Sequence, residues 1–264
     1  MITFKERKYL VSKGIDSFFT GVFDAWSFIF RFFKELFIPP FHFKEFIHQV
    51  YETGLKSLPL ITLTGFVTGI VFTKQSRPSL EVFGATSWLP SLITIALVKA
   101  LGALVTALIC AGKVGSSIGA ELGSMRVSEQ IDAMEVSAIN PFKFLVVTRV
   151  AAITVAVPIL SMYCTFVGLM GSYLNVKANE NTGFLNFFIS GFETTTFLDL
   201  NVAVIKAVVF GFTIGIIGCY KGYYATQGTR GVGKAANQTV WMAMFLVFVE
   251  EIIIVQIANW FRVQ

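Results

Sequence analysis

One eight-residue stretch of the sequence has nearly the spacing of a phosphate-binding loop. Residues 228–235 read GTRGVGKA, close to the pattern GxxxxGK[ST] that cradles nucleotide phosphates. Ala235 stands where the pattern needs a magnesium-binding hydroxyl, and an apolar, helix-like run precedes the motif where a strand is required. We therefore expect no nucleotide site in this chain, and we interpret the glycines as a tight loop that abuts a partner.

The residue types that bind metals or attack substrates are scarce. His42 and His48 are six residues apart with no cysteine nearby, which does not suit a zinc site. Cys110, Cys164 and Cys219 all fall inside apolar runs, where cysteine behaves as a small buried hydrophobe. The sequence therefore predicts no metal site and no catalytic residues.

A helix with an acidic face is predicted between a small-residue run before Glu121 and Pro141. It would have about five turns, with an apolar stripe and a polar stripe beside it. The apolar stripe is Val127, Ile131, Met134 and Ala138, and the polar stripe is Ser128, Asp132 and Glu135. Such a helix can rest on other helices while its carboxylates meet the basic groups of a soluble partner. The alternative is a solvated surface helix without a partner.

The composition shows what kind of scaffold must position these residues. Of the 264 residues, 55% are apolar and 14% are charged, and the mean hydropathy is +0.70. Soluble domains carry about 25% charged residues, so an ordinary soluble enzyme is excluded, and 28 Phe residues exclude disorder. The net charge of +5 is too small and scattered for a nucleic-acid binder, so we expect no nucleic-acid partner.

Five stretches reach the roughly 20 mostly apolar residues that a membrane-spanning helix needs. They are residues 57–73, 88–111, 143–173, 201–224 and 238–261. The predicted fold is therefore an all-α integral membrane protein, with residues 57–264 as a five-span domain. The interrupted outer segment, residues 175–201, is predicted to hold a short helix lying at the surface or re-entering the membrane.

Residues 1–56 are predicted to precede the spans as amphipathic helices. In residues 15–38, aromatic residues recur at three- and four-residue spacing opposite a polar face, which is typical of a helix lying in the membrane interface. The apolar face is Phe19, Val22, Phe23, Trp26, Phe30, Phe33 and Phe37, and the polar face is Ser17, Thr20, Asp24, Ser27, Arg31 and Lys34. A sixth span is the alternative, but it would place Asp24 and Arg31 in hydrocarbon.

Basic residues predict the orientation. With the N-terminus in the cytoplasm, the inner segments hold eight Lys and Arg in residues 1–56, three between spans two and three, and three between spans four and five. The outer segments hold four, which is a clear positive-inside bias. We expect a multi-pass protein with a cytoplasmic N-terminus, an external C-terminus and a cytoplasmic segment near residues 112–142.

The run AELGSMRVSEQIDAM, at residues 120–134, resembles the signature of the MlaE/YrbE-type permeases. These are the membrane subunits of lipid-transporting ABC systems that work with MCE proteins in the bacterial inner membrane. Further motifs that resemble the family lie before and after this run, in the same order as in the family and along nearly the whole chain. They are Ser57–Pro59, Gly65, Gly69, Gln75, Gly84, Pro141, Arg149, residues 205–222 and residues 228–240.

The resemblance implies a lipid permease without enzymatic activity or a cofactor of its own. ATP and magnesium would be bound by a separate cytoplasmic ATPase, and the acidic helix would be the coupling helix docked in a groove of that ATPase. The implied coupling residues are Glu121, Gly123, Met125, Glu129, Gln130, Asp132 and Glu135. The family forms homodimers in which lipid occupies a cavity between the two copies, beneath a ring of MCE subunits.

One departure from the family concerns that cavity. Where the family reads R-E-x-G-P, this chain keeps a cation at Lys99 but has Ala100 and Ala103 in place of Glu and Pro. Lys99 therefore needs another partner, a lipid headgroup or an interface that its long chain reaches. Glu250 and Glu251 are the other cavity candidates; consecutive helical residues point about 100° apart, so we expect one of them to face the interior.

Further sequence features concern Lys206, the glycine spacing and the alternative functions. Lys206 is expected to extend toward the outer interface rather than bind. Glycines spaced by three and four residues from Gly211 to Gly222, and the pair Gly65 and Gly69, predict close helix packing against another span or a second copy. A membrane enzyme acting on lipids and a channel without energy coupling are the competing functions, and the sequence indicates neither the lipid nor its direction of transport.

Overall fold

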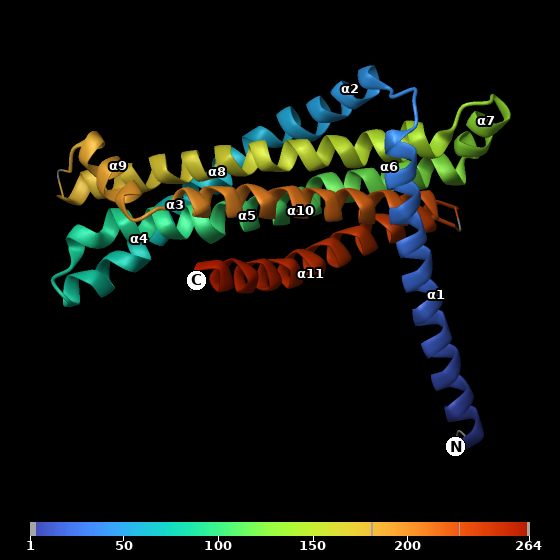
Figure 1. Cartoon of the computed structure of the whole chain (residues 1–264), viewed down its shortest axis with the longest axis horizontal. Coiled ribbons are helices and arrows are strands. Elements are labelled where there is room, and N and C mark those ends of the chain that lie inside the picture. The colour runs from blue at the N-terminus through green and yellow to red at the C-terminus, as the bar shows by residue number, and fades with distance from the viewer. Residues whose placement is uncertain (1–3, 181, 227, 263–264) are drawn as a thin grey trace.

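The computed structural model describes residues 4–180, 182–226 and 228–262, and side chains between Thr20 and Trp260 within those ranges. The described residues form helices and short connections and include no strand. Long helices run side by side as an elongated bundle, with α1 crossing one end (Figure 1). Five helical stretches among the described residues are long and apolar enough to cross a membrane, which confirms the predicted all-α membrane fold.

The first two stretches are interrupted rods. Helix α2 (Phe43–Gly54) passes through a 3-10 turn (Leu55–Ser57) into α3 (Leu58–Val82), so the predicted boundary between residues 56 and 57 falls within that turn. The second stretch combines a 3-10 turn (Thr86–Trp88) with α4 (Leu89–Ala96), α5 (Gly102–Cys110) and α6 (Ser116–Val127). Two π-helical turns join its helices: Leu97–Leu101 and Ala111–Gly115.

The remaining helices complete the bundle. A short helix, α7 (Gln130–Val136), precedes a π-helical turn (Phe142–Val147) and the long α8 (Thr148–Glu180), which continues through Pro158. At the other end, α9 (Phe184–Glu193) is the short helix predicted in the outer segment. Its Phe187 is fully buried against Leu89, Ile93 and Tyr173.

Helices α8 and α10 (Phe197–Tyr223) form the centre, and α3 and α11 (Gly228–Arg262) form the edges. In the most apolar part of the third stretch, 72% of the residues are buried, against 22% in the first stretch and 11% in the fifth. The edge helices therefore expose much of their apolar surface within a single chain.

The glycine-rich faces lie between spans of the same chain. A Cβ atom at Gly69 would lie 1.9 Å from the Gly168 carbonyl oxygen, and one at Gly211 would lie 2.8 Å from the Ile153 carbonyl oxygen. Only glycine allows α8 to approach α3 and α10 this closely. This settles the open alternative in favour of packing within the chain.

Helix α1 (Phe4–Phe37) crosses the bundle at the end that carries α6 and α7, and it ends before Pro39-Pro40 as predicted (Figure 1). It is not one of the five apolar stretches. The predicted aromatic face is largely exposed, whereas the two buried aromatic residues at the contact with the bundle, Phe28 and Phe32, belong to neither predicted face. Phe33 of the aromatic face and Arg31 of the polar face also contact the bundle, at the rings of Phe212 and Phe142. The side chains of Ser17 and Phe19 lie outside the described residues.

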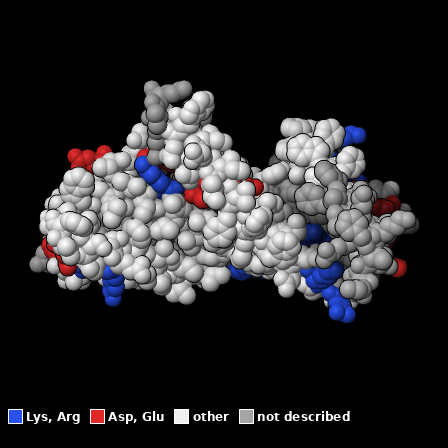
Figure 2. All heavy atoms as spheres, turned by 90° about the horizontal axis from the view of Figure 1, so that it is seen from below, with Lys and Arg blue, Asp and Glu red and all other residues white. Residues whose placement is uncertain are grey.

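Figure 2 shows how charge is distributed over one side of the bundle. Most of this face is uncharged, and its Lys, Arg, Asp and Glu side chains gather mainly toward the two ends, apart from a small charged group between them. This distribution suits a bundle whose middle faces hydrocarbon and whose ends face water.

Candidate functional site

The acidic segment between spans two and three forms a helical hairpin. The prediction of one helix of about five turns is wrong: α6 ends at Val127 and α7 begins at Gln130. Glu129 takes the left-handed conformation at φ 59°, which reverses the chain, and its backbone N–H donates to the Arg126 carbonyl at 3.2 Å. The first half of the predicted helix is thus the end of span two.

Helix α7 is anchored to the bundle through its apolar residues. Ile131 is fully buried in the main core and Met134 packs against it, as the predicted stripe requires. Ala138, the fourth residue of that stripe, is exposed and has φ 61°, so it lies beyond the helix rather than in the contact. The hairpin is therefore fixed to the bundle by few side chains.

The acidic face of the hairpin is exposed. Glu129, Gln130, Asp132 and Glu135 are all exposed side chains. Asp132 accepts a hydrogen bond from the Arg126 guanidinium across the hairpin. None of the ion pairs found among the described residues involves Glu129 or Glu135, so these two carboxylates present uncompensated negative charge.

Of the other predicted coupling residues, Gly123 and Met125 face inward, whereas Glu121 has an exposed side chain that pairs with a buried one. Gly123 is buried where α6 packs against Ala225 and Val232, and Met125 packs partly buried against the core. Glu121 accepts a hydrogen bond from Arg149 Nη2 at 2.6 Å, and the Arg149 side chain is only 3% exposed. Glu121 therefore ties span two to span three.

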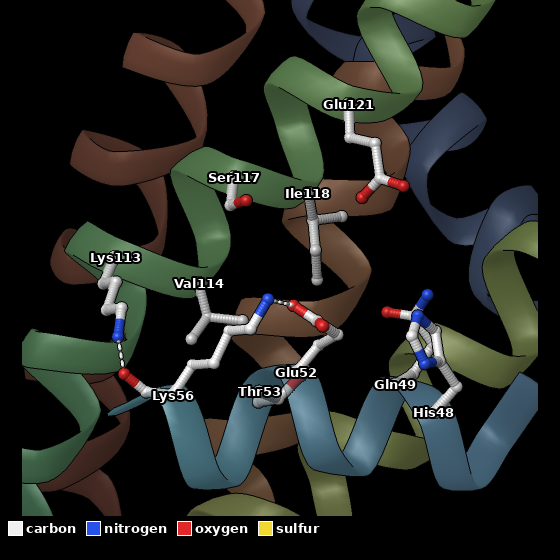
Figure 3. Close-up of a pocket in the computed structure, with 10 residues that line it drawn as sticks. All are labelled: His48, Gln49, Glu52, Thr53, Lys56, Lys113, Val114, Ser117, Ile118 and Glu121. Atoms are coloured by element: carbon white, nitrogen blue, oxygen red, sulfur yellow. Dashed lines mark hydrogen bonds and ion pairs between the residues drawn. The ribbon is translucent and has the colours of Figure 1, made fainter. Parts of the chain in front are cut away.

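Glu121 also borders a polar groove between α6 and α2 (Figure 3). The groove has a volume of about 440 Å³. One wall carries Glu52 of α2 and Lys56 of the 3-10 turn after it, which form an ion pair at 2.6 Å. The Lys113 ammonium donates to the Lys56 carbonyl. The groove is thus an open surface at the same end of the bundle as the hairpin, and its Glu52 and Lys56 charges pair with each other.

Toward the opposite end of span two, Lys99 forms an ion pair with another residue of the chain. Its Nζ lies 3.0 Å from Asp199 Oδ2, and Asp199 is 2% exposed. Asp199 also accepts a hydrogen bond from the Thr196 N–H at 3.1 Å and so caps the start of α10. The sequence left open whether Lys99 has a partner in the chain, binds a lipid headgroup or reaches an interface. The structure shows a partner, Asp199, in place of the glutamate that the family has at the position of Ala100.

Lys206 does not extend to an interface, so that prediction is wrong. Its ammonium is buried and donates to Glu251 Oε1 at 2.7 Å and to the Lys99 carbonyl at 3.1 Å. Glu250 accepts a hydrogen bond from the Thr213 hydroxyl at 2.5 Å. The expectation that one of the two glutamates faces the interior is also wrong, because both long side chains reach α10 from adjacent positions on α11.

These contacts link spans two, four and five through four charged residues: Asp199, Lys99, Lys206 and Glu251. Sequence reasoning missed Asp199 and Thr213 as partners. A signal for Asp199 existed, since Thr196 and Asp199 have the spacing of a capping box at the start of a span.

An apolar cavity of about 590 Å³ lies near this network. Spans two, three and four and helix α9 line it, through residues that include Val98, Ala103, Phe166, Phe188 and Leu200. Its walls carry mostly carbon atoms, which suits a hydrocarbon chain. Ala103, one of the two departures from the family pattern, is part of this wall.

The remaining candidate features hold no site among the described residues. No group of three or more His, Cys, Asp or Glu side chains is arranged to hold a metal there, and the three cysteines are buried. Residues 228–235 are the first turns of α11 rather than a loop, which corrects the predicted tight loop.

Comparisons with known proteins agree on one family. The family model described as Permease MlaE matches residues 46–257. A probable ABC transporter permease protein of Rickettsia prowazekii is 34% identical over 237 residues, which cover 90% of this chain and 91% of the relative. A similarly described protein of Synechocystis is 34% identical over 206 residues, 77% of each chain. The chloroplastic protein TRIGALACTOSYLDIACYLGLYCEROL 1 of Arabidopsis thaliana is 31% identical over 213 residues, 81% of this chain and 61% of the relative.

The family match and the five apolar stretches agree with each other. The chain belongs to the MlaE permease family and is a multi-pass ABC transporter permease.

Proposed function

We propose that this permease moves phospholipid or a related lipid, driven by ATP hydrolysis in a separate cytoplasmic ATPase that binds the α6–α7 hairpin. The observation that carries the proposal is the pair of exposed carboxylates at Glu129 and Glu135 on a hairpin fixed to span two. An ABC permease works with an ATPase, and negative side chains on a rigid hairpin suit a basic groove in that partner.

The hairpin is connected to the spans by a direct mechanical path. Helix α6 continues through a π-helical turn into α5, so movement of α7 acts along span two. The pair of Glu121 and Arg149 carries the same movement to span three. Two arrangements of the spans with similar free energy, biased by the nucleotide state of the ATPase, would open and close a lipid path.

The lipid assignment is supported by the apolar cavity and by Lys99. An acyl chain would occupy the 590 Å³ cavity, and the phosphate of its headgroup would compete with Asp199 for Lys99. Lys99 is suited to this exchange because its side chain is 28% exposed, whereas that of Asp199 is 2% exposed.

The proposed assembly places this chain in a bacterial inner membrane as a homodimer. The poorly buried α3 and α11 would meet a second copy, and an MCE protein would cover the outer side, where α9 lies. The N-terminus and the hairpin would be cytoplasmic and the C-terminus external, as the distribution of Lys and Arg favours.

The test is purification of the complex with its ATPase in nanodiscs, followed by measurement of lipid-stimulated ATP hydrolysis. We expect the double variant Glu129→Lys/Glu135→Lys to lose most of the stimulation, because its charges would repel a basic groove. The matched control is Glu193→Lys, an exposed glutamate at the opposite end of the bundle. Full stimulation in the double variant would reject the hairpin as the ATPase contact.

A further inference from the structure

A second candidate binding site lies where α10 ends and α11 begins. A cavity of about 220 Å³ is lined there by Tyr220, Lys221, Tyr224, Thr226, Lys234 and Gln238, among others. A larger open hollow of about 730 Å³ adjoins it, lined by Arg230, Gly233, Lys234, Asn237, Gln238 and Trp241. Lys234 and Gln238 belong to both, so the two form one continuous concave surface.

The side chains that line this surface carry only positive charge, and the carboxylate of Asp24 on α1 acts on one of them, Tyr220, from outside the wall. Three cations line it, Lys221, Arg230 and Lys234, and neither cavity has an Asp or Glu in its wall. None of the ion pairs found among the described residues involves these cations. The Lys221 ammonium lies 5.5 Å from the centre of the Tyr220 ring. Three cations that line one concave surface with no acidic side chain in its walls favour binding of an anion.

Hydrogen-bond donors accompany the cations. The side-chain amides of Asn237 and Gln238 and the hydroxyls of Thr226 and Tyr224 line the same walls. A phosphate group has several acceptor oxygens and a negative charge, so it would use both the ammonium groups and these neutral donors.

The surroundings place the surface at the border between polar and apolar parts of the bundle. Tyr224 and Trp241 are 55% and 56% exposed, as aromatic residues are at the headgroup level of a membrane. Phe28 of α1 packs edge-on against Tyr220 at 5.4 Å and Tyr224 at 6.0 Å. Helix α1 itself exposes Trp26 and Phe30. The exposed rings of Tyr224 and Trp241 therefore give the basic cavity an apolar border for acyl chains.

We propose that Lys221, Arg230 and Lys234 bind the phosphate of an anionic phospholipid headgroup between α10, α11 and α1. Basic pockets between spans on the cytoplasmic side are suited to anionic headgroups. This lipid is distinct from the transported one, because Lys99 and the apolar cavity lie at the other end of the spans. Its binding would hold α1 and the α10–α11 turn together next to the hairpin.

The experiment measures phosphatidylglycerol binding to the full chain by native mass spectrometry, in detergent and in phosphatidylcholine nanodiscs. We expect the affinity of Lys221→Ala/Lys234→Ala to fall roughly tenfold or more, since each cation contributes on the order of a fivefold gain. The charge-conserving Lys221→Arg/Lys234→Arg should keep the binding. The matched control is Lys177→Ala, at the opposite end, whose ammonium also lies over a tyrosine ring, that of Tyr173 at 6.0 Å.

Three results would overturn the proposal. The first is equal phosphatidylglycerol binding by the alanine variant and the unaltered chain. The second is displacement of phosphatidylglycerol by excess inorganic phosphate, which would assign the surface to a soluble phosphate compound. The third is loss of the ATPase from the alanine variant with lipid binding unchanged, which would make the surface a protein contact. The outcome is independent of the Glu129 and Glu135 variants, so it can fail without the proposed transport function failing.

Discussion

Lys206 and Glu251 form an ion pair in the apolar part of the bundle, with 2.7 Å between Nζ and Oε1 and with side chains 2% and 13% exposed. The two residues are 45 positions apart in the sequence. Their pairing fixes span four against span five, whose helix is otherwise the least buried of the five. A charge at this depth is tolerated because its partner is present.

The first prediction follows from that pair. Lys206→Met alone leaves Glu251 without its cation and should destabilise the fold by about 3–5 kcal/mol. The double variant Lys206→Met/Glu251→Met should recover most of the loss, because no uncompensated charge remains. Thermal unfolding in detergent measures both, with Lys74→Met at an exposed position of α3 as the control. A single variant as stable as the double variant would refute the structural role of the pair.

The second prediction concerns the contact between α3 and α8. Gly69→Ala places a methyl group against the Gly168 carbonyl oxygen and should cost about 1–3 kcal/mol as the helices separate. Gly233→Ala on α11 meets no atom within 4 Å and should instead stabilise its helix by about 0.5–1 kcal/mol. Unfolding temperatures of the two variants should thus shift in opposite directions. Equal shifts would show that α3 does not pack this closely.

The third prediction separates the two roles of Lys99. Lys99→Leu should reduce the anionic phospholipid that copurifies with the complex, while the ATPase stays bound. Asp199→Asn should increase it, because a neutral amide competes less well with a lipid phosphate for the Lys99 ammonium. Lipid analysis of the purified complexes measures both. If neither change alters the lipid content, Lys99 serves only to pair with Asp199.

Hydropathy and spacing predicted the five spans, the presence of a helix in α1 and the short α9, because each follows from a long or periodic run of apolar residues. The contact face of α1 was not predictable in this way. Phe28 is buried because Phe142, Tyr220 and Tyr223 lie opposite it, and Phe32 lies opposite Phe212. All four partners are more than a hundred positions away in the sequence.

The candidate site was predicted in outline but not in its partners. The acidic residues of the hairpin are exposed as the spacing indicated, but the turn at Glu129 has no glycine to mark its left-handed conformation. The partners of Lys99 and Lys206 depend on which spans are neighbours. Charged residues inside apolar runs indicate that counter-ions are needed. The packing of α10 against span two shows that Asp199 is the partner of Lys99, and the packing of α10 against α11 shows that Glu251 is the partner of Lys206.

Photo-crosslinking tests most directly whether the α6–α7 hairpin is the contact with the ATPase. A photoreactive amino acid would replace Glu135 in the assembled complex, and the same substitution at Glu193 would serve as the control. We predict a covalent product of permease and ATPase from position 135 and none from position 193. A complex that contains the ATPase but gives no product from position 135, or gives one from position 193, would contradict the account.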